Sequence, residues 1–509
     1  MVARPSLPEL LALHATRTPD APCLACDGEV LSFADVEARS NRLGNALAAR
    51  GVVQGDRVAI LAHTSPTYYE LAFACARLGA IMLPLNWRLA PREIAGIFAD
   101  ATPVLVIAAA DLQPLLADVS AAPPIIGLET EYPSFRDTAP DTQFHDTIMP
   151  DAPALLLYTS GTTGLPKGVM ISNANLAHVE CMAREAWGFA TDSVNLVAMP
   201  LFHIGGIGYG MMALSQGGHT VLLQAADPTS ILAAIRAHSV THAFFVPTVI
   251  YRLVAHADAT GAAPTSLQRI MYGAAPIGES LLRRAVTTFG CEFNHAYGMT
   301  ETAGTVITLA PEDHHPSGPH SARLRSCGKP LPWVELALVD PATNTEVVTG
   351  EVGEIRIRSG MVMLGYWNKP AETAAAITAD GWLCTGDAAF IDADGYVTIH
   401  DRYKDMIVSG GENIYPTELE NVLADHPAVS EVAVIGVPHA KWGETPRAYF
   451  VAREGHAASE AELIAFSRTR LAHYKCPTSV VLVEALPRNA SGKILKRDLR
   501  DIDRTRSAV

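Results

Sequence analysis

A chain of 509 residues is too long for a single hydrophobic core, so two or more domains are expected. Apolar residues make up 49% of the chain, and the formal net charge is −15. This charge gives no general attraction to nucleic acid or anionic lipid, so any bound phosphate must be held by local groups. The composition therefore favours an enzyme that acts on small molecules.

The N-terminus and the cysteines bear on the location of the protein. The first residues lack a basic segment followed by an apolar one, and no run approaches the length of a membrane span, so a cytoplasmic protein is predicted. The eight cysteines are too scattered for a disulfide scaffold, and reduced thiols are expected. Cys23 and Cys26 form a lone C-x-x-C, which favours two core cysteines over a zinc or redox site.

Helical and extended patterns alternate through the first half of the chain. Alternation of this kind is typical of a parallel sheet covered by helices, and it predicts an α/β fold. The expected elements are helices at 35–49 and about 230–238, and strands at 58–61, 104–107, 220–223 and 243–246.

The pattern changes in the last third of the chain. Short β runs such as 353–358 are separated by Gly, Asp and Pro between about 316 and 399, and they predict a small β subdomain. A charged break follows at 400–405. A helix from about Pro416 and a strand at 432–435 then predict a separate C-terminal domain, and about a hundred residues suffice for one.

The segment 158–170, with the sequence YTSGTTGLPKGVM, is the most informative part of the chain. Glycines let backbone N–H groups turn toward an anion, hydroxyls add donors, and a lysine ammonium adds positive charge. The segment predicts a cradle for a triphosphate, against the alternative of a Gly/Thr hairpin without a ligand. The candidate phosphate ligands are Thr159, Ser160, Gly161, Thr162, Thr163 and Lys167.

The flanks of this cradle argue against a Walker A loop. That loop needs a glycine directly before its lysine and a helix directly after it, whereas a proline precedes Lys167 here. The apolar runs 155–157 and 169–171 are typical of buried strands. A helix is expected only later, with Asn173 or Asn175 at its start.

Three more polar clusters have no obvious structural role. The segment 296–301 (AYGMTE) offers an aromatic face for a base, a hydroxyl for a phosphate and a carboxylate suited to Mg²⁺. The segment 381–387 ends in Asp387, whose carboxylate can accept hydrogen bonds from both ribose hydroxyls, although alone the segment also fits a turn. The segment 486–494 presents Lys493, which alone also fits a solvated surface residue.

The order of these motifs closely resembles the acyl-adenylate-forming superfamily, which includes acyl-CoA synthetases, aryl-CoA ligases, luciferases and peptide-synthetase adenylation domains. YTSGTTGLPKG is followed by YGMTE, TGD, DRxKD and GK, and five motifs in order are far more specific than any one. The resemblance spans nearly the whole chain. It implies a large N-terminal domain of two helix-covered sheets with a small β-barrel subdomain, and a small mobile α+β C-terminal domain.

The resemblance also implies a two-step reaction that uses ATP, Mg²⁺ and a thiol such as coenzyme A. A carboxylate attacks the α-phosphorus to give acyl-AMP and pyrophosphate, and the thiol then displaces AMP. This chemistry needs positioning and charge neutralisation more than covalent help. By the resemblance, the cradle holds the β- and γ-phosphates. By the same resemblance, Thr300 contacts the α-phosphate and Glu301 binds Mg²⁺. Tyr297 stacks on adenine, beside Gly273, Ala274 and Ala275, and Asp387 and Arg402 bind the ribose. Lys493 lies between the carboxylate and the α-phosphate.

The resemblance places a hinge at Lys404, about which the C-terminal domain swings between the two half-reactions. It divides the chain into an AMP-binding domain at 1–400, a hinge at 401–404 and a C-terminal domain at 405–509 with the catalytic lysine. Glycines after the hinge, including Gly411, are expected beside the passage of a narrow thiol arm. A plain linker is the alternative.

His203 lies in a segment that resembles the acyl-CoA ligase version of a motif in which amino-acid adenylation domains carry an aspartate nearby. The lack of that aspartate argues against amino-acid substrates, and His203 matches the gate of the carboxylate pocket, with a core histidine as the alternative. The acyl-pocket candidates are His203, Gly205, Gly206, Phe244, Ala275 and Ala296, with Ile207, Tyr209, Met211 and Phe245 also able to enclose the acid.

The pocket candidates include no cation, and a buried second carboxylate without a partner is costly, so the far end of the acid is expected to be neutral. Fatty and aromatic acids both stay open, and fatty acids are favoured. For the acceptor, Trp442 is expected to stack on the adenine of CoA, with packing as the alternative, and Lys475 to meet a CoA phosphate.

CoA is favoured over a carrier protein because the chain ends soon after Lys493 with no fused carrier domain. A free-standing ligase that loads a separate carrier is the second hypothesis. A non-catalytic nucleotide sensor is disfavoured because Lys167, Glu301, Asp387 and Lys493 are all present. No nucleic-acid partner is expected, and a homodimer is left open.

Replacement of Lys493 by alanine tests its predicted role at the reacting centre. The Lys493→Ala variant is expected to lose adenylation, because negative charge builds at the α-phosphate without a cation beside it. Conversion of supplied acyl-AMP into thioester is expected to survive. Pyrophosphate release and thioester formation from acyl-AMP are measured separately, and a normal rate of pyrophosphate release would contradict the assignment.

Overall fold

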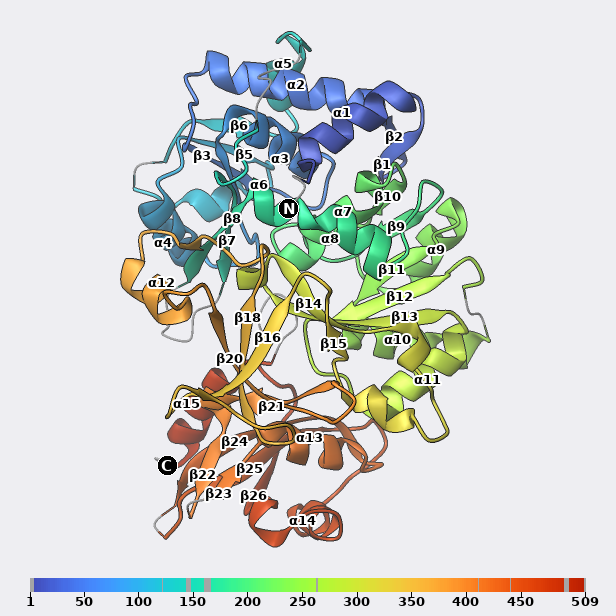
Figure 1. The fold of residues 1–509 in the computed structure, drawn as a ribbon, viewed down its shortest axis with the longest axis vertical. Coiled ribbons are helices and arrows are strands. Elements are labelled where there is room, and N and C mark those ends of the chain that lie inside the picture. The colour runs from blue at the N-terminus through green and yellow to red at the C-terminus, as the bar shows by residue number, and fades with distance from the viewer. Residues whose placement is uncertain are drawn as a thin grey trace.

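The computed structural model describes residues 4–120, 122–142, 148–159, 166–261, 264–410, 412–439, 441–488 and 494–507, without the side chains of residues 402, 404, 413 and 507. Four sheets organise the chain (Figure 1). The two largest are mostly parallel and carry the N-terminal two thirds. The α/β prediction is confirmed, because parallel strands alternate with helices along the chain.

The first large sheet has seven strands and holds both flanks of the predicted cradle. Its central strands are parallel, whereas β7, β8 and β19 form antiparallel pairs at one edge. The strands, in sheet order, are β19 (Gly365–Tyr366), β8 (Lys167–Ser172), β7 (Pro153–Thr159), β4 (Ile81–Pro84), β3 (Arg57–Leu61), β5 (Leu105–Ala108) and β6 (Ile125–Gly127).

The second large sheet has nine strands, six of which form the parallel centre between antiparallel edges. The strands, in sheet order, are β15 (Lys329–Pro330), β14 (Gly304–Leu309), β13 (Glu292–Met299), β12 (Arg269–Gly273), β11 (His242–Phe245), β9 (Val194–Val197), β10 (His219–Leu222), β1 (Pro22–Cys26) and β2 (Glu29–Ser32).

Successive residues along the central strands of this second sheet enter different hydrophobic cores. Phe244 and Met271 pack on the side covered by α8 (Ile204–Ser215), whereas Phe245 and Tyr272 pack on the side covered by α9, α10 and α11. Side chains of a strand alternate between the two faces of a sheet, so both faces are buried. The three helices of the second side are α9 (Pro228–His238), α10 (Pro247–Thr260) and α11 (Glu279–Phe289).

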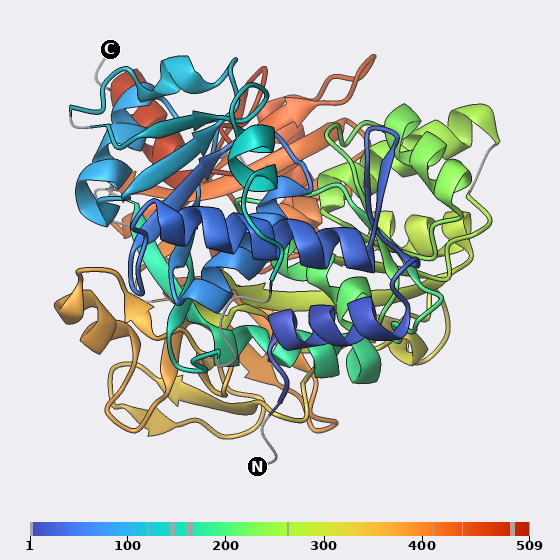
Figure 2. The same ribbon diagram turned by 90° about the horizontal axis from the view of Figure 1, so that it is seen from above.

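Helices from the start of the chain join the two large sheets. Seen from above, α1 and α2 lie across the molecule (Figure 2), and α1 contacts both α3 and α8. The helix expected at 35–49 is α2, which Ser32 and Asp35 cap reciprocally. The helices of this part are α1 (Leu7–Arg17), α2 (Phe33–Ala49), α3 (Thr67–Leu78), α4 (Pro91–Ala101), α5 (Tyr132–Asp137), α6 (Asn173–Leu176) and α7 (His178–Cys181).

The helix expected to start at Asn173 or Asn175 is α6, which begins at Asn173. Ser172 is its N-cap residue, and the Ser172 hydroxyl accepts a hydrogen bond from the backbone N–H of Asn175. The side chain of Asn175 accepts from the Ser172 N–H in return, at 2.9 Å. Serine and asparagine are both favoured N-cap residues, and the N-cap falls on Ser172 because β8 ends there.

The small β subdomain is confirmed as a five-stranded antiparallel sheet. One short helix, α12 (Pro370–Ala376), precedes its longest strand. The strands, in sheet order, are β17 (Thr345–Glu346), β16 (Glu335–Asp340), β18 (Gly353–Arg358), β20 (Leu383–Ile391) and β21 (Val397–Arg402).

The C-terminal sheet has its own two cores and lies at one end of the molecule, beside β21 (Figure 1). One core is formed with α13 (Pro416–Ala424) and α14 (Glu460–Arg468), and the other with α15 (Lys496–Ser507). Its strands are β23 (Glu412–Ile414), β22 (Ile407–Ser409), β25 (Gly443–Ala452), β24 (Val429–His439) and β26 (Ser479–Leu482). The domain boundaries at 400 and 404 stay a prediction.

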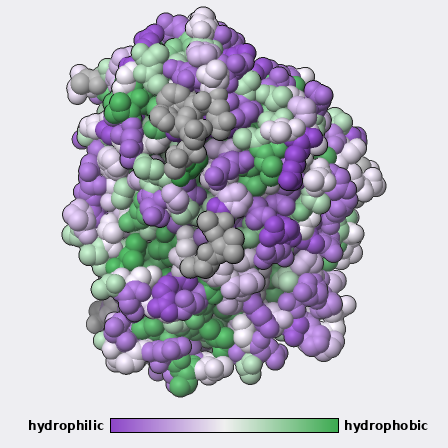
Figure 3. Space-filling model, turned by 45° about the horizontal axis from the view of Figure 1, so that its top comes forward, coloured by the Kyte–Doolittle hydropathy of each residue, from purple (hydrophilic) through white to green (hydrophobic). Residues whose placement is uncertain are grey.

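Hydrophilic residues are spread over the face shown in Figure 3, with hydrophobic residues in separate groups between them. Within the described ranges, no helix is long and apolar enough to cross a membrane. All eight cysteines, each of them described, are free, and Cys23 and Cys26 are buried. The prediction of two core cysteines in the C-x-x-C segment is therefore confirmed.

Buried histidines make the fold sensitive to acid. Burial lowers the pKa of His242, His295 and His314 from 6.5 to about 4. Between these values the unfolded chain binds protons that the native protein does not, so the free energy of unfolding is expected to fall as pH decreases from 6.5 toward 4. The His295→Gln variant is expected to show a shallower fall of melting temperature over this range, and an identical fall would contradict this origin.

Candidate active site

The predicted phosphate cradle connects two antiparallel strands. Thr159 ends β7 and pairs across the hairpin with Lys167, the first residue of β8. A strand, not a helix, therefore follows the lysine, which confirms the exclusion of a Walker A loop. Ser160, Gly161, Thr162 and Thr163 lie outside the described residues, so their phosphate contacts stay predictions.

Tyr366 links the cradle lysine to the predicted magnesium ligand. Its hydroxyl donates to Glu301 Oε1 at 2.9 Å, and Lys167 Nζ lies 5.0 Å from the centroid of its ring. The pairing of β19 with β8 fixes this position, because Tyr366 is opposite Val169 in the antiparallel ladder. One tyrosine thus contacts an ammonium through its ring and a carboxylate through its hydroxyl.

Tyr297 and Asp387 bring the second and third motifs together. The Tyr297 hydroxyl donates to Asp387 Oδ2 at 2.7 Å, so β13 of the nine-stranded sheet meets β20 of the β subdomain. Burial and the Asp387 carboxylate raise the pKa of Tyr297 well above its ordinary value, which keeps the phenol protonated as a donor. Asp387 also pairs across β20 and β21 with the backbone of Arg402.

The chain reverses tightly where β12 ends beside β13. A Cβ atom at Gly273 would lie 2.1 Å from the carbonyl oxygen of Ala296, so only glycine fits there. Ala274 follows with a φ of 64°, a left-handed conformation that alanine rarely adopts. Ala275 continues this turn. The carboxyl ends of β12 and β13 therefore place Gly273, Ala274 and Ala296 next to Tyr297, where parallel sheets usually bind ligands.

Thr300 and Glu301 follow β13 directly in a short 3₁₀ turn (Thr300–Thr302). The backbone carbonyl of Glu301 accepts from the N–H of Met363 at 2.9 Å, which ties this turn to the segment before Tyr366. The described residues contain no group of three or more His, Cys, Asp or Glu side chains that could hold a metal. A single carboxylate fits Mg²⁺ that enters on ATP, because this ion keeps most of its water and phosphate ligands.

His203 caps the start of α8 at the predicted gate of the acyl pocket. Burial and the positive charge of Arg88 lower its pKa to about 4, so the imidazole is neutral at physiological pH. Its Nε2 is buried without a partner in the described part of the chain. A Cβ at Gly206 would lie 2.1 Å from the carbonyl oxygen of Pro200, so a glycine is required two residues into this helix.

The other acyl-pocket candidates lie around the same helix. Gly205 faces the ring of Phe244, whose Cε1 would lie 3.9 Å from a Cβ at that position. Tyr209, one turn further along α8, packs on Phe244 with ring centroids 5.5 Å apart. The structure thus brings Gly205, Phe244 and Tyr209 together on one side of the nine-stranded sheet.

The predicted CoA residues lie in the C-terminal unit. Lys475 Nζ is bound to both carboxylate oxygens of Glu418, at 2.9 and 2.8 Å, so a CoA phosphate would compete with this pair. Trp442 is 45% exposed and covers the backbone of Gly410, where a Cβ would lie 2.8 Å from the indole. Lys441 Nζ lies 4.3 Å from the centroid of the indole ring, so an adenine that stacked on that face would displace this ammonium.

Four further predicted residues have little or no described structure. Gly411 and Lys493 lie outside the described residues, and only the backbones of Arg402 and Lys404 are described. Ion pairs flank the predicted hinge on both sides, since Lys496 Nζ lies 3.5 Å from Asp401 and Arg500 lies 2.8 Å from Asp405. Both cations belong to α15, which begins shortly after Lys493.

Sequence reasoning missed Tyr366 as a site residue. Its neighbours in the chain, Gly365 and Trp367, form no motif with a chemical meaning of its own. Its role depends on the pairing of β19 with β8, two segments almost two hundred residues apart, and a single sequence does not display such a pairing.

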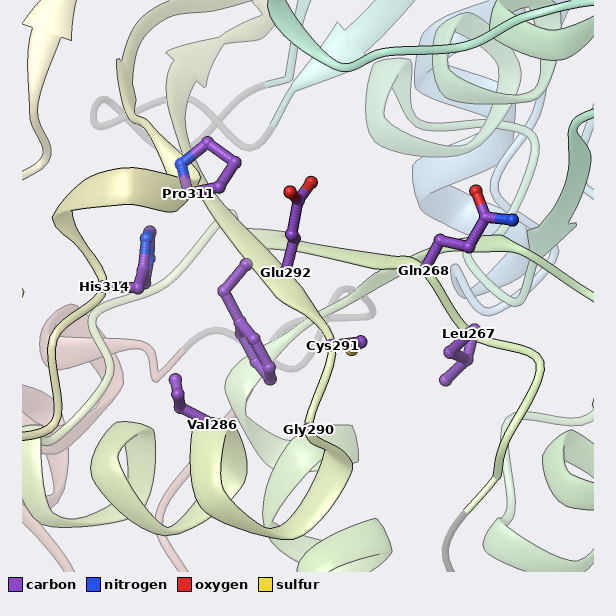
Figure 4. A pocket seen from close by; sticks show the side chains of 9 residues that line it. Leu267, Gln268, Val286, Gly290, Cys291, Glu292, Pro311 and His314 are labelled. Atoms are coloured by element: carbon purple, nitrogen blue, oxygen red, sulfur yellow. The ribbon is translucent and has the colours of Figure 1, made fainter.

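A surface cavity of about 500 Å³ lies elsewhere, at the amino ends of β12 and β13 (Figure 4). Cys291 lies there, and burial raises its pKa to about 12, so its thiol is unreactive at neutral pH. This edge is opposite to the one that carries Gly273 and Tyr297. The lining residues are Leu267, Gln268, Val286, Gly290, Cys291, Glu292, Phe293, Pro311 and His314.

Comparison with known proteins identifies the family. The model of AMP-binding enzymes matches residues 11–367, and the model of the AMP-binding enzyme C-terminal domain matches residues 418–493. The chain belongs to the AMP-binding enzyme family. The superfamily resemblance of the sequence is thereby confirmed, and with it an enzyme of the AMP-forming carboxylate–CoA ligase type that uses ATP and a carboxylic acid.

Characterised members of this AMP-binding family match over the whole chain. A fatty acid–[acyl-carrier-protein] ligase of Streptomyces coeruleorubidus is 36% identical over 97% of this chain and 96% of its own. A feruloyl-CoA synthase of Amycolatopsis is 38% identical over 96% of this chain and 97% of its own. The o-succinylbenzoate CoA synthetase of Bacillus subtilis with its acyl-adenylate superposes with a TM-score of 0.86 and 32% identity, over 97% of this chain and 98% of that one.

The Tyr366→Phe variant tests the link between Lys167 and Glu301. It keeps the ring under the ammonium and removes the hydrogen bond to the carboxylate, so kcat/KM for MgATP is expected to fall about tenfold. The Tyr366→Leu control, which loses both contacts, is expected to fall further. Steady-state rates at varied MgATP concentration measure kcat/KM for each variant. Wild-type values for both variants would contradict a role of Tyr366 in the nucleotide site.

Proposed function

We propose that this AMP-binding enzyme is an ATP-dependent acyl-CoA synthetase for a hydrophobic carboxylic acid. The observation that carries the proposal is the junction of Lys167, Tyr366 and Glu301 beside Tyr297 and Asp387, because it supplies a cation, a carboxylate and a nucleotide anchor at one edge of the sheets. The site residues keep the roles that the sequence predicts.

In the first step a carboxylate oxygen of the acid attacks the α-phosphorus of ATP. The bond from that phosphorus to the bridging oxygen breaks, and pyrophosphate leaves with both electrons of that bond. Lys167 neutralises charge on the leaving group, and Glu301 would hold Mg²⁺, which would supply further positive charge to the phosphates. In the second step the CoA sulfur attacks the acyl carbonyl, the thiol loses its proton, and AMP leaves with the phosphate oxygen.

The gate of the acyl pocket supports an anionic reacting end and an uncharged tail. Arg88 is close enough to His203 for its charge to lower the imidazole pKa, and a cation at the gate attracts a carboxylate. Deeper on the same sheet face, Arg269 is paired with Glu292, whose Oε2 accepts from Arg269 Nε at 2.9 Å. A second carboxylate would find no unpaired cation among these deeper residues.

The nature of the tail is the finer part of the proposal. A fatty acid is the sequence prediction, and the similarity to a fatty acid–[acyl-carrier-protein] ligase supports it. The second candidate is an aromatic acid, which the similar feruloyl-CoA synthase and the aromatic packing of Trp187, Tyr209 and Phe244 favour. CoA stays the preferred acceptor, and the 45% exposed Trp442, whose ring Lys441 Nζ contacts at 4.3 Å from the centroid, stays its candidate adenine contact.

Incubation with MgATP, CoA and a panel of straight-chain, branched, aromatic, dicarboxylic and amino acids tests the proposal. AMP and an acyl-CoA thioester are expected together for acids with a neutral tail, and little product for dicarboxylates and amino acids, whose second charge finds no partner. Acyl-AMP without thioester would indicate a ligase that loads a carrier protein. Absence of acid-dependent ATP–pyrophosphate exchange would indicate a nucleotide sensor instead.

A further inference from the structure

A buried amide in the nine-stranded sheet has no hydrogen-bond partner. Asn294 in β13 is 1% exposed, and neither its Nδ2 nor its Oδ1 bonds to any described residue. Leaving one buried polar group unpaired costs about 1–3 kcal/mol, and an amide holds both donors and an acceptor. Such a group calls for an occupant that the free protein lacks.

The register of the sheet places Asn294 on the acyl-pocket face. Asn294 is in register with Met271, which is in register with Phe244, and residues in register share one face. Ala296, a predicted acyl-pocket residue next to Tyr297, is two residues further along β13 on that face. A strand rises about 3.3 Å per residue, so Asn294 lies about 7 Å deeper than Ala296.

The helix above this face carries a second unpartnered group. Tyr209 in α8 is 3% exposed, and its hydroxyl has no partner in the described part of the chain. Its ring packs on Phe244 at 5.5 Å and on Trp187 at 6.0 Å, and the Trp187 Nε1 is also unpartnered. Burial raises the pKa of Tyr209, which keeps its phenol neutral.

The next residues on the same face, toward the amino ends of β12 and β13, are charged. Arg269 and Glu292 are in register with each other, two residues before Met271 and Asn294, and they form an ion pair. Because the two charges satisfy each other, this layer offers no free charge to a ligand. Among the residues of β12 and β13 on this face, Asn294 therefore carries the deepest uncharged polar group without a partner in the described part of the chain.

We propose that Asn294 determines acid specificity by binding a neutral oxygen, a hydroxyl or a carbonyl, at the far end of the acid. The inference rests on the proposed function, which supplies the reacting end at Ala296. Asn294 Nδ2 donates to that oxygen, and Oδ1 accepts from the hydroxyl proton where there is one. The hydroxyl of Tyr209 in α8, on the same face of the nine-stranded sheet, is a second neutral polar group without a partner in the described part of the chain.

This assignment predicts discrimination between acids that differ only in one oxygen. A site built to hydrogen-bond a substrate hydroxyl rejects the analogue that lacks it, because the buried amide then stays unpaired. A ω-hydroxy fatty acid and a para-hydroxylated aryl acid both present the required oxygen. The two classes share the chemistry and differ in the shape of the linker between the carboxylate and the hydroxyl.

The experiment compares matched acids in the ATP–pyrophosphate exchange assay. One arm pairs 3-phenylpropanoic acid with its 4-hydroxyphenyl counterpart, and the other pairs straight-chain acids with their ω-hydroxy counterparts over a range of lengths. The hydroxylated member of at least one arm is expected to have a kcat/KM at least about tenfold higher. The arm that responds identifies the linker as aromatic or alkyl.

The Asn294→Leu variant removes the amide and keeps its approximate size. It is expected to lose the preference for the hydroxylated acid and to keep activity on the unsubstituted one. It is also expected to melt at a higher temperature, because an unpaired buried amide is replaced by an apolar group. The matched control is His295→Gln on the opposite face of β13, which is expected to keep the wild-type preference.

Three results would overturn the assignment. The first is an equal kcat/KM for both members of every pair in the wild type, and the second is an unchanged preference in Asn294→Leu. The third is a lower melting temperature of Asn294→Leu, because the amide would then be bonded in the free protein. If no acid at all supports exchange, the proposed function itself fails. Exchange with hydrophobic acids but without oxygen preference leaves the proposed function standing and refutes only this inference.

Discussion

The hydrogen bond between Tyr297 and Asp387 is the contact on which the architecture of the site depends. It joins the nine-stranded sheet to the β subdomain at 2.7 Å, and it uses a carboxylate that is 7% exposed. A buried carboxylate is tolerated only with partners, so the two units are held at the edge where nucleotide residues gather. Loss of the tyrosine hydroxyl would remove one partner of this buried carboxylate and loosen the contact between the two units.

The two faces of the nine-stranded sheet differ in how well their buried groups are satisfied. The face under α9, α10 and α11 is a continuous apolar core in which Phe245 and Tyr272 are almost fully buried. The face under α8 is less well satisfied, because Asn294, Tyr209 and Trp187 all bury polar atoms without partners. Proteins tolerate such groups chiefly where a ligand completes them, at a cost in stability.

Much of the fold and some of the site could be predicted from the sequence. Local periodicity and capping gave α2 and α9 within a few residues, and the strand after Lys167 excluded a Walker A loop. Tyr366 and Asn294 were not predicted, because their roles come from strand pairing and from the face on which a residue falls. Those properties depend on distant segments, such as β19 against β8, which a single sequence does not display.

The sequence by itself determined the family and the reaction type, because five short motifs in a fixed order are far more specific than any one of them. The tertiary structure alone decided which of those residues meet, as in the Lys167–Tyr366–Glu301 junction and the Tyr297–Asp387 bond. It also decided which polar groups stay unpaired beneath α8. The physical reason is that a motif is a local property of the chain, whereas contact, register and burial arise only when distant segments pack together.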